Sequence, residues 1–226
     1  MKKFVILIPP SEGKKKGGKG SSLGKASKHT EAIIKKLKDP DQNWGKVLGV
    51  KGKALEEAVQ SNRQILSSST MPAIERYTGV VYSAVDYPSL TAKAKTFFNQ
   101  HVRIVSAVFG LVKPVDLIPD YKLKIDKLGT DKYWQPIVQE ELKGAFIVDL
   151  LPQAHRKAVN YENGIAVDFS FVKNGKKIPA GHHGKHIKGR FIRWLAEHQC
   201  TDPDSFKNFK EDGMRWRDSE FIKTVG

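Results

Sequence analysis

The chain has 226 residues, of which 39% are hydrophobic, enough to bury one sizeable core. Lys and Arg number 39 against 24 Asp and Glu, which gives a net charge of +15. Such an excess favours polyanionic partners, and nucleic acid is the first candidate. The alternative is a basic surface that serves only solubility. No apolar run reaches the roughly 18 residues of a membrane span. Cys200 is the only cysteine, which excludes an intrachain disulfide and a cysteine-rich zinc site and favours a reducing, cytoplasmic location.

The N-terminal part combines an apolar strand with a basic loop. Residues 4–8 are apolar without alternation, which predicts a strand covered on both faces rather than a signal peptide. Pro9 and Pro10 end this strand. Residues 13–20 are so rich in Gly and Lys that we expect a mobile loop. Such a loop either contacts phosphates or is simply solvated, and it lacks the Walker A pattern.

Hydrophobic periodicity predicts helices and strands that interleave along the rest of the chain. Helices are expected at 30–37, 53–66, 91–100, 133–142 and 185–198, and strands at 80–82, 102–108 and 145–151. Asn174-Gly175 predicts a hairpin between strands at 165–172 and 176–179. Pro152 suits the start of a short helix, and the aromatic tail at 206–226 is expected to pack on the body. The order predicts a single α/β domain over residues 1–226, with a mixed sheet flanked by helices.

The central stretch 102–125 ends a buried strand in a polar loop. Pro114 and Pro119 restrict that loop, which carries Lys113, Asp116, Asp120 and Tyr121. A rigid loop at the rim of a sheet is suited to holding functional groups. The alternative is a connection that needs its prolines only for shape.

The helix at 185–198 has one lysine in an unusual place. Lys188 falls inside the apolar stripe of Ile187, Phe191, Ile192 and Leu195, whereas Lys185, Arg190 and Arg193 lie mostly on the other side. Lys188 must therefore snorkel, pair with a carboxylate or line a cavity. The positive end of the helix dipole disfavours a cation in the first turn. We interpret Lys188 as a candidate cavity lysine, with Asp116 or Asp149 as its partner.

Other polar residues have a structural and a functional interpretation. His182, His183 and His186 have a spacing compatible with a metal, but their basic surroundings favour contact with phosphate, and no metal or cofactor is assigned. Asp116, Asp120 and Asp149 are possible general bases. Tyr77 and Tyr82 either stack on bases or, as is more usual for tyrosines near a strand, pack in the core.

Four motifs together resemble the peroxide stress protein YaaA family. They are ILIPPSEGK, GVVYSA, SAVFGLVKPVDLIPDYKLKI and KHIKGRFIR, and they span nearly the whole chain. The resemblance implies an unusual α/β fold with a basic cleft and a helix-hairpin-helix-like element. It also implies DNA binding, protection of DNA under hydrogen peroxide stress and limitation of free intracellular iron. The matching residues are Ser11, Tyr82, Gly110, Lys113, Pro114, Asp116, Tyr121, Lys185, Lys188, Gly189 and Arg193, whereas Arg190 and the 13–20 loop depart from the family pattern.

Two functions follow as hypotheses. The first is a DNA-binding protein of the peroxide response that contacts double-stranded DNA mainly through phosphates. The second is an enzyme acting on a nucleobase or nucleoside, because a lysine near a carboxylate can perform glycosidic-bond chemistry. Direct iron binding is disfavoured by the scarcity of clustered ligands.

The candidate site residues are expected to gather in one cleft. Lys188, Lys185, Lys113, Asp116 and Tyr121 should converge there, together with a small ligand that carries a phosphate or carboxylate. The catalytic candidates are Lys188, Asp116 and Tyr121; the nucleic-acid-binding candidates are Lys113, Lys185, Lys188, Arg190 and Arg193; and Ser11 and Tyr82 are placed at the cleft edge.

Overall fold

A computed structural model describes residues 3–225, and residues 1, 2 and 226 lie outside the described part. Its central sheet has five strands in the order β4-β3-β1-β6-β7. Four are parallel and β4 is antiparallel to β3, so the predicted mixed sheet flanked by helices is confirmed. The strands are β1 (Lys3–Ile8), β3 (Val102–Ser106), β4 (Gly110–Val112), β6 (Ala145–Asp149) and β7 (Gly164–Ala166).

Strand β1 lies at the middle of this sheet because its side chains are apolar on both faces. Val5 to Ile8 are each at most 1% exposed. The strand pairs with β3 on one side and with β6 on the other. The chain passes from β1 to β3 and later returns to the opposite side of β1 as β6. The carboxyl end of β1 is therefore a topological switch point, where open α/β sheets form ligand crevices.

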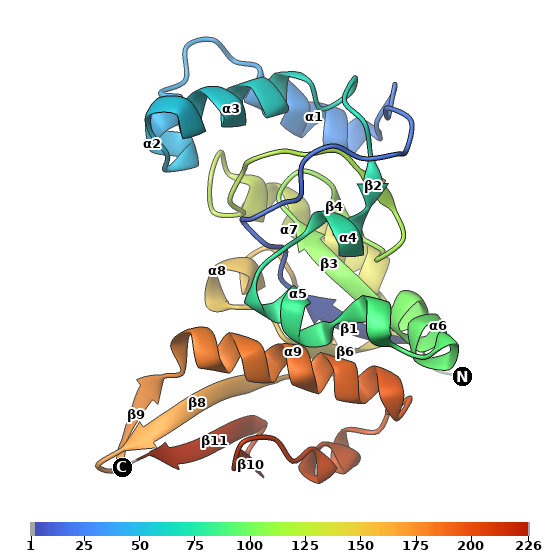
Figure 1. Cartoon of the computed structure of the whole chain (residues 1–226), viewed down its shortest axis with the longest axis vertical. Coiled ribbons are helices and arrows are strands. Elements are labelled where there is room, and N and C mark those ends of the chain that lie inside the picture. Colours follow the sequence, from blue (N-terminus) through green and yellow to red (C-terminus); the bar gives the residue numbers. More distant parts are fainter. Residues whose placement is uncertain (1–2, 226) are drawn as a thin grey trace.

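Helices surround the sheet, and most lie within a few residues of their predicted positions. The helices α1 to α3 lie together at one end of the molecule (Figure 1). The helices of this part are α1 (Lys28–Leu37), α2 (Trp44–Leu48), α3 (Gly52–Arg63), α4 (Ala73–Arg76), α5 (Val80–Val85), α6 (Ala92–His101), α7 (Thr130–Leu142) and α8 (Gln153–Arg156), with a short 3-10 helix at Tyr87–Ser89. Strands β2 (Met71–Pro72) and β5 (Leu117–Ile118) form a small antiparallel pair.

The C-terminal part forms a second sheet that the sequence did not predict. It has four strands in the order β10-β11-β8-β9. They are β8 (Asp168–Lys173), β9 (Lys176–Pro179), β10 (Arg215–Arg217) and β11 (Glu220–Val225). The predicted Asn174-Gly175 hairpin is confirmed between β8 and β9. Helix α9 (Gly181–Glu197) lies between this sheet and the rest of the molecule (Figure 1).

Aromatic packing attaches the tail to the body, as expected. After a 3-10 helix (Pro203–Asn208), the chain returns as β10 and β11. Phe221 is fully buried, and its ring centroid lies 5.0 Å from that of Phe191 on α9 and 5.4 Å from that of Phe169 on β8. Large aromatic side chains provide much of the burial energy in such a cluster.

Two predicted elements differ in the structure. The strand expected at 80–82 is wrong, because these residues begin helix α5, which packs on α9. The β-branched pair Val80-Val81 suggested a strand, but the tertiary contact with α9 overrides that preference. Helix α9 begins at Gly181 rather than at residue 185. Lys188 therefore lies in the second turn of α9, where the helix dipole disfavours a cation less than in the first turn.

The 13–20 segment is bridged to the body at two points, where the sequence analysis expected a mobile loop. Lys14 forms an isolated antiparallel bridge with Tyr77, and Gly20 forms one with Thr70. A Cβ at Gly18 would lie 2.2 Å from the Thr70 carbonyl oxygen. Its glycines thus permit a close backbone approach.

Within residues 3–225, none of the helices combines the length and apolar character needed to cross a bilayer.

Candidate active site at the carboxyl edge of the central sheet

Polar residues gather where the parallel strands of the central sheet end. Ser11 follows β1, Ser106 ends β3, Asp149 ends β6 and Asp168 lies just beyond β7. Parallel strands present their carboxyl ends at the same edge of a sheet, and ligands bind there at the switch point. The fold therefore places these four side chains along the edge where a ligand is expected.

A cavity of about 310 Å³ lies at this edge, which we call the carboxyl-edge cavity. Ser11 and Lys14 line it from the segment after β1, Tyr121 and Lys124 from the loop after β5, and His155 from α8. Its volume is at the lower end of the range of small-molecule sites. The structure thus brings together Ser11 and Tyr121 of the predicted residues, and adds Lys14 and His155.

Lys14 contributes an amine that the sequence analysis placed in a solvated loop. Its Nζ donates to the Ser11 carbonyl oxygen at 3.1 Å and lies 4.2 Å from the centroid of the Tyr121 ring. Within residues 3–225, no carboxylate lies within ion-pair distance of this amine, and the negative charges that act on it are those of Asp120 and Glu12. Burial lowers the pKa of Lys14 to about 8, because the charged form loses its hydration.

A chain of buried hydroxyl groups supports Tyr121. Its hydroxyl lies 2.8 Å from Ser106 Oγ and 2.7 Å from the Tyr77 hydroxyl. Burial raises the pKa of Tyr121 to about 12 and raises that of Tyr77 well above its usual range. Both phenols are therefore neutral at physiological pH. Tyr77 and Tyr82 are 2% and 8% exposed, so the expectation that they pack in the core is confirmed.

Lys188 lies beside two carboxylates but hydrogen-bonds to a backbone carbonyl. Its Nζ donates to the Leu150 carbonyl oxygen at 2.5 Å and lies 5.8 Å from the centroid of the Phe169 ring. Burial lowers the pKa of Lys188 to about 8, although Asp168 and Asp149 act in the opposite direction. The lysine is partly buried, as its position in the apolar stripe predicts.

Arg156 ties the end of β6 and the start of β8 to α8. Its Nε donates to Asp149 at 3.1 Å, and its two terminal nitrogens donate to the carboxylate of Asp168 at 3.0 and 2.8 Å. Asp149 also accepts from the Leu151 N–H at 2.8 Å and from the Tyr161 hydroxyl at 3.3 Å. Burial raises the pKa of Asp149, against the lowering effect of these hydrogen bonds. The network holds α8 in place, and with it His155.

His155 is a neutral imidazole on the cavity wall. Burial lowers its pKa to about 4; the Asp126 carboxylate raises the pKa and the Lys188 ammonium lowers it. Its Nδ1 is buried and has no hydrogen-bond partner within the described part of the chain. Buried polar atoms are normally paired, so an orphaned nitrogen beside a cavity is compatible with a ligand contact. No pattern in the sequence singled out this histidine.

The predicted convergence of Lys188 with Lys113 and Asp116 is wrong. Strand β4 runs antiparallel to β3, with Val112 opposite Ile104, so Lys113 emerges near the amino end of β3. Asp116 Oδ2 accepts from the Lys113 N–H at 2.8 Å. Strand β4 is the opposite edge strand from β7 and three places from β6. The first part of the proline loop thus holds Lys113 and Asp116 at the amino edge of the sheet, away from Lys188, whereas Tyr121 at its end reaches the carboxyl-edge cavity.

The remaining predicted residues occupy different environments. Tyr82 donates to the Pro9 carbonyl oxygen at 2.8 Å and is not part of the cavity wall. Lys185 is exposed, and Arg190 pairs with Glu211 at 3.4 Å. Arg193 is only 15% exposed and donates to the Val85 carbonyl oxygen at 3.1 Å, so its expected position away from the core is wrong.

The histidines at the start of α9 show no metal cluster. Within residues 3–225, no three His, Cys, Asp or Glu side chains gather as a set of metal ligands. His183 instead forms a hydrogen bond with Asp212, which also pairs with Lys223 at 2.8 Å.

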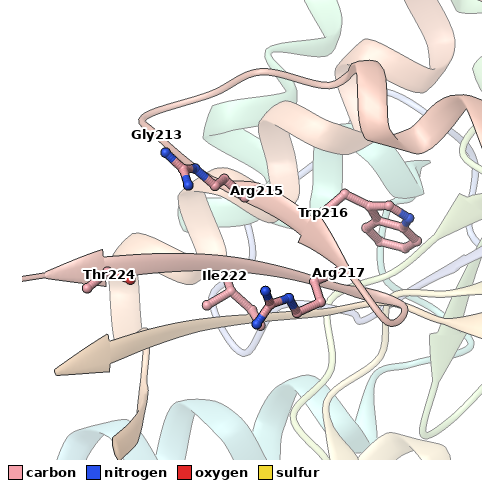
Figure 2. A pocket seen from close by; sticks show the side chains of 6 residues that line it. All are labelled: Gly213, Arg215, Trp216, Arg217, Ile222 and Thr224. Carbon is pink, nitrogen blue, oxygen red and sulfur yellow. The ribbon is translucent and has the colours of Figure 1, made fainter. Parts of the chain in front are cut away.

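A separate hollow of about 420 Å³ lies on the C-terminal sheet (Figure 2). Arg215, Trp216 and Arg217 on β10 line it with Ile222 on β11, and the Trp216 side chain points in another direction than the two arginines. This alternation is expected along a strand. The hollow adds two exposed guanidinium groups to the surface but contains none of the buried titratable groups described above.

The protein is thus an α/β protein with a cavity at the switch point of its central sheet, the place where open α/β sheets form ligand crevices. A family model described as peroxide stress protein YaaA matches residues 4–220, and the chain therefore belongs to that family. The family resemblance of the four motifs is thus confirmed. The expected basic cleft and helix-hairpin-helix-like element stay predictions.

Curated relatives match this chain over most of its length. A UPF0246 protein of Corynebacterium glutamicum strain R is 32% identical over 213 residues, which cover 85% of each chain. A UPF0246 protein of Streptomyces coelicolor is 30% identical over 216 residues, covering 85% of this chain and 82% of the relative. A UPF0246 protein of Acaryochloris marina is 26% identical, with 98% of this chain and 97% of the relative covered.

Proposed function

We propose that the protein binds double-stranded DNA, mainly through its phosphates, as part of the peroxide stress response. The observation that carries this proposal is the net charge of +15 in a member of the peroxide stress family. An excess of Lys and Arg neutralises phosphates irrespective of base sequence. Through the family, the proposal extends to protection of DNA under hydrogen peroxide stress and to limitation of free intracellular iron.

The distribution of cations supports contact with a polyanion. Lys113 and Lys185 are exposed, and within residues 3–225 neither has a carboxylate at ion-pair distance. Arg215 and Arg217 are also exposed on β10. Exposed cations without internal partners can bind phosphates without first breaking an intramolecular pair.

Titration of a fluorescent duplex by anisotropy tests this function. Between about 50 and about 200 mM salt we expect the affinity to fall roughly 10³-fold or more, if the protein makes six or more phosphate contacts. Two duplexes of unrelated sequence should bind alike, because phosphates carry no sequence information. Absence of binding at low salt, or an affinity that does not change with salt, would refute the proposal.

The carboxyl-edge cavity favours a second candidate function, an enzyme acting on a nucleobase or nucleoside. Its support is the presence of Lys14 and the neutral His155 on the walls of one cavity. An amine of lowered pKa and a neutral imidazole are a nucleophile and an acid–base group. Release of free base from nucleosides or DNA, followed by chromatography, distinguishes this candidate from simple binding.

A further inference from the structure

Lys14 is the reactive group that DNA binding leaves unexplained. Its amine lies at the end of β1, beside a cavity at the switch point, and is held by the Ser11 carbonyl oxygen. A lysine that only contacts phosphates gains from being exposed and charged. Lys14 is instead partly buried between the Tyr77 and Tyr121 rings, 5.4 and 4.2 Å from their centroids.

Burial raises the fraction of Lys14 that is in the neutral, nucleophilic form. With a pKa of about 8, roughly one amine in ten is neutral at pH 7, against about one in three thousand for an ordinary lysine. The charged and titratable groups that face it are Asp120, Glu12, Lys122, Arg76, Tyr77 and Tyr121. Lys122 and Arg76 favour the neutral form, whereas Asp120 and Glu12 oppose it.

We propose that the carboxyl-edge cavity receives an aldehyde and that Lys14 forms an imine with it. This inference rests on the proposed DNA binding, which makes the aldehyde the ring-opened deoxyribose of an abasic site. Such a sugar has lost its base, so a cavity of about 310 Å³ has to hold only a sugar and a flanking phosphate. Extrusion of an abasic sugar also costs less than extrusion of a paired nucleotide.

The chemistry balances with the groups present. The lone pair of Lys14 Nζ attacks the C1′ aldehyde carbon, and the carbonyl oxygen becomes the hydroxyl of a carbinolamine. That hydroxyl leaves as water when it is protonated, and the amine loses its remaining hydrogen to give the imine. His155, a neutral imidazole on the same cavity, is the group that moves these protons. No oxidant, reductant or metal is required.

The rim of the cavity suits the flanking phosphate. Lys124 and Lys122 both pair with Glu12, at 3.1 and 3.3 Å. Asp126, which also lines the cavity, pairs with Lys127 at 3.7 Å. Three ammonium groups thus share two carboxylates, and the rim keeps a positive charge. A phosphate next to the abasic sugar would find that charge beside Lys14.

Borohydride trapping tests the imine directly. Hydride adds to the imine carbon and a proton adds to the nitrogen, which leaves a stable secondary amine between DNA and protein. A labelled duplex with one abasic site is incubated with the full-length protein and sodium borohydride, and the adduct is resolved on a denaturing gel. We expect an adduct that mass spectrometry maps to Lys14, and no adduct with a tetrahydrofuran analogue, which has no aldehyde.

Variants separate chemistry from folding and charge. Lys14→Arg keeps the positive charge but cannot form an imine, and should lower the adduct yield at least tenfold. Lys19→Arg makes the same exchange at an exposed lysine of the same segment and should leave the yield unchanged. If circular dichroism shows that Lys14→Arg does not fold, peptide mapping of the wild-type adduct identifies the lysine that formed the imine.

The outcomes distinguish this inference from the DNA-binding proposal. If the protein binds intact duplex with the expected salt dependence but yields no adduct, or an adduct on other lysines such as Lys188, the inference is wrong and DNA binding stands. If intact duplex does not bind while free 2-deoxyribose 5-phosphate is trapped on Lys14, the DNA-binding function is wrong and the amine chemistry of the cavity stands.

Discussion

Arg193 stabilises the contact between α5 and α9 from the end of α5. Its Nη1 donates to the Val85 carbonyl oxygen at 3.1 Å and to Ser89 Oγ at 2.7 Å, and its Nε pairs with Glu197 at 2.8 Å. The carbonyl groups at the end of a helix need such donors. The guanidinium therefore serves the fold and is poorly placed to contact a phosphate.

We predict that Arg193→Ala lowers the free energy of unfolding by about 2 kcal/mol, because it leaves helix-end carbonyls without a donor. Urea denaturation measures this change. Arg190→Ala is the matched control: Arg190 is 40% exposed with one ion pair, and its loss should cost less than about 0.5 kcal/mol. An Arg193→Ala variant of normal stability with weakened duplex binding would restore the role expected from the sequence.

At the residue scale, a buried polar side chain could be predicted from the sequence only where it interrupts a regular hydrophobic pattern. Lys188 could be recognised as inward-facing because its neighbours on one helix define the apolar stripe. Lys14 and His155 could not, because the environment of each is made by distant segments. Lys14 is enclosed by Tyr77 and Tyr121, and His155 is influenced by Asp126 and Lys188. Such contacts have no local pattern.

At the scale of elements, Gly189 allows α9 to approach α5 closely. A Cβ at this position would lie 2.4 Å from the Val81 carbonyl oxygen and 2.6 Å from Ala84 Cβ. Two helix backbones meet this closely only where one side chain is absent. The contact also positions Lys188, the neighbouring residue, toward the carboxyl edge of the sheet.

We predict that Gly189→Ala destabilises the protein by about 2 kcal/mol, since the added methyl group must push α5 away. Gly45→Ala in α2 is the control, because its Cβ would have no neighbour closer than 3.6 Å. That change should be neutral or stabilising by up to about 1 kcal/mol, from the higher helix propensity of alanine. Urea denaturation measures the unfolding free energy of both variants. If the two substitutions change it equally, α5 moves aside without loss of stability and the prediction is wrong.

The elements that sequence reasoning missed are those defined by tertiary contacts. Strands β1, β3 and β6 were predictable because each is an apolar run long enough to be distinctive. The strand pair β8–β11 was not, since Phe169 and Phe221 are partners across about fifty residues of chain. Helix α5 was mistaken for a strand because six residues are too few to show a helical period.

At the scale of the whole molecule, the central sheet lies between two of the exposed lysines that we propose contact DNA. Lys113 is at the amino edge, close to the start of β3. Lys185 lies near Lys188, whose pKa it helps to lower, and so belongs to the carboxyl edge with Lys14 and the cavity. A duplex is straight over the length of this protein, and it cannot follow both edges at once without bending.

The orientation of bound DNA can therefore be tested with two charge reversals. We predict that Lys185→Glu weakens binding of a duplex more than Lys113→Glu, because the carboxyl edge carries the cavity and its lysines. Lys185→Glu should also reduce the slope of log affinity against log salt by roughly 0.9 for each phosphate that the variant no longer neutralises. Anisotropy titrations at several salt concentrations measure both quantities.

The two substitutions are matched, since each replaces one exposed lysine and changes the net charge equally. Any difference between them therefore reports where the DNA lies and not how much charge the protein carries. A larger loss of affinity with Lys113→Glu would place the duplex at the amino edge, away from Lys14. Equal losses of affinity would mean that binding is spread over the whole basic surface, because long-range attraction responds to total charge.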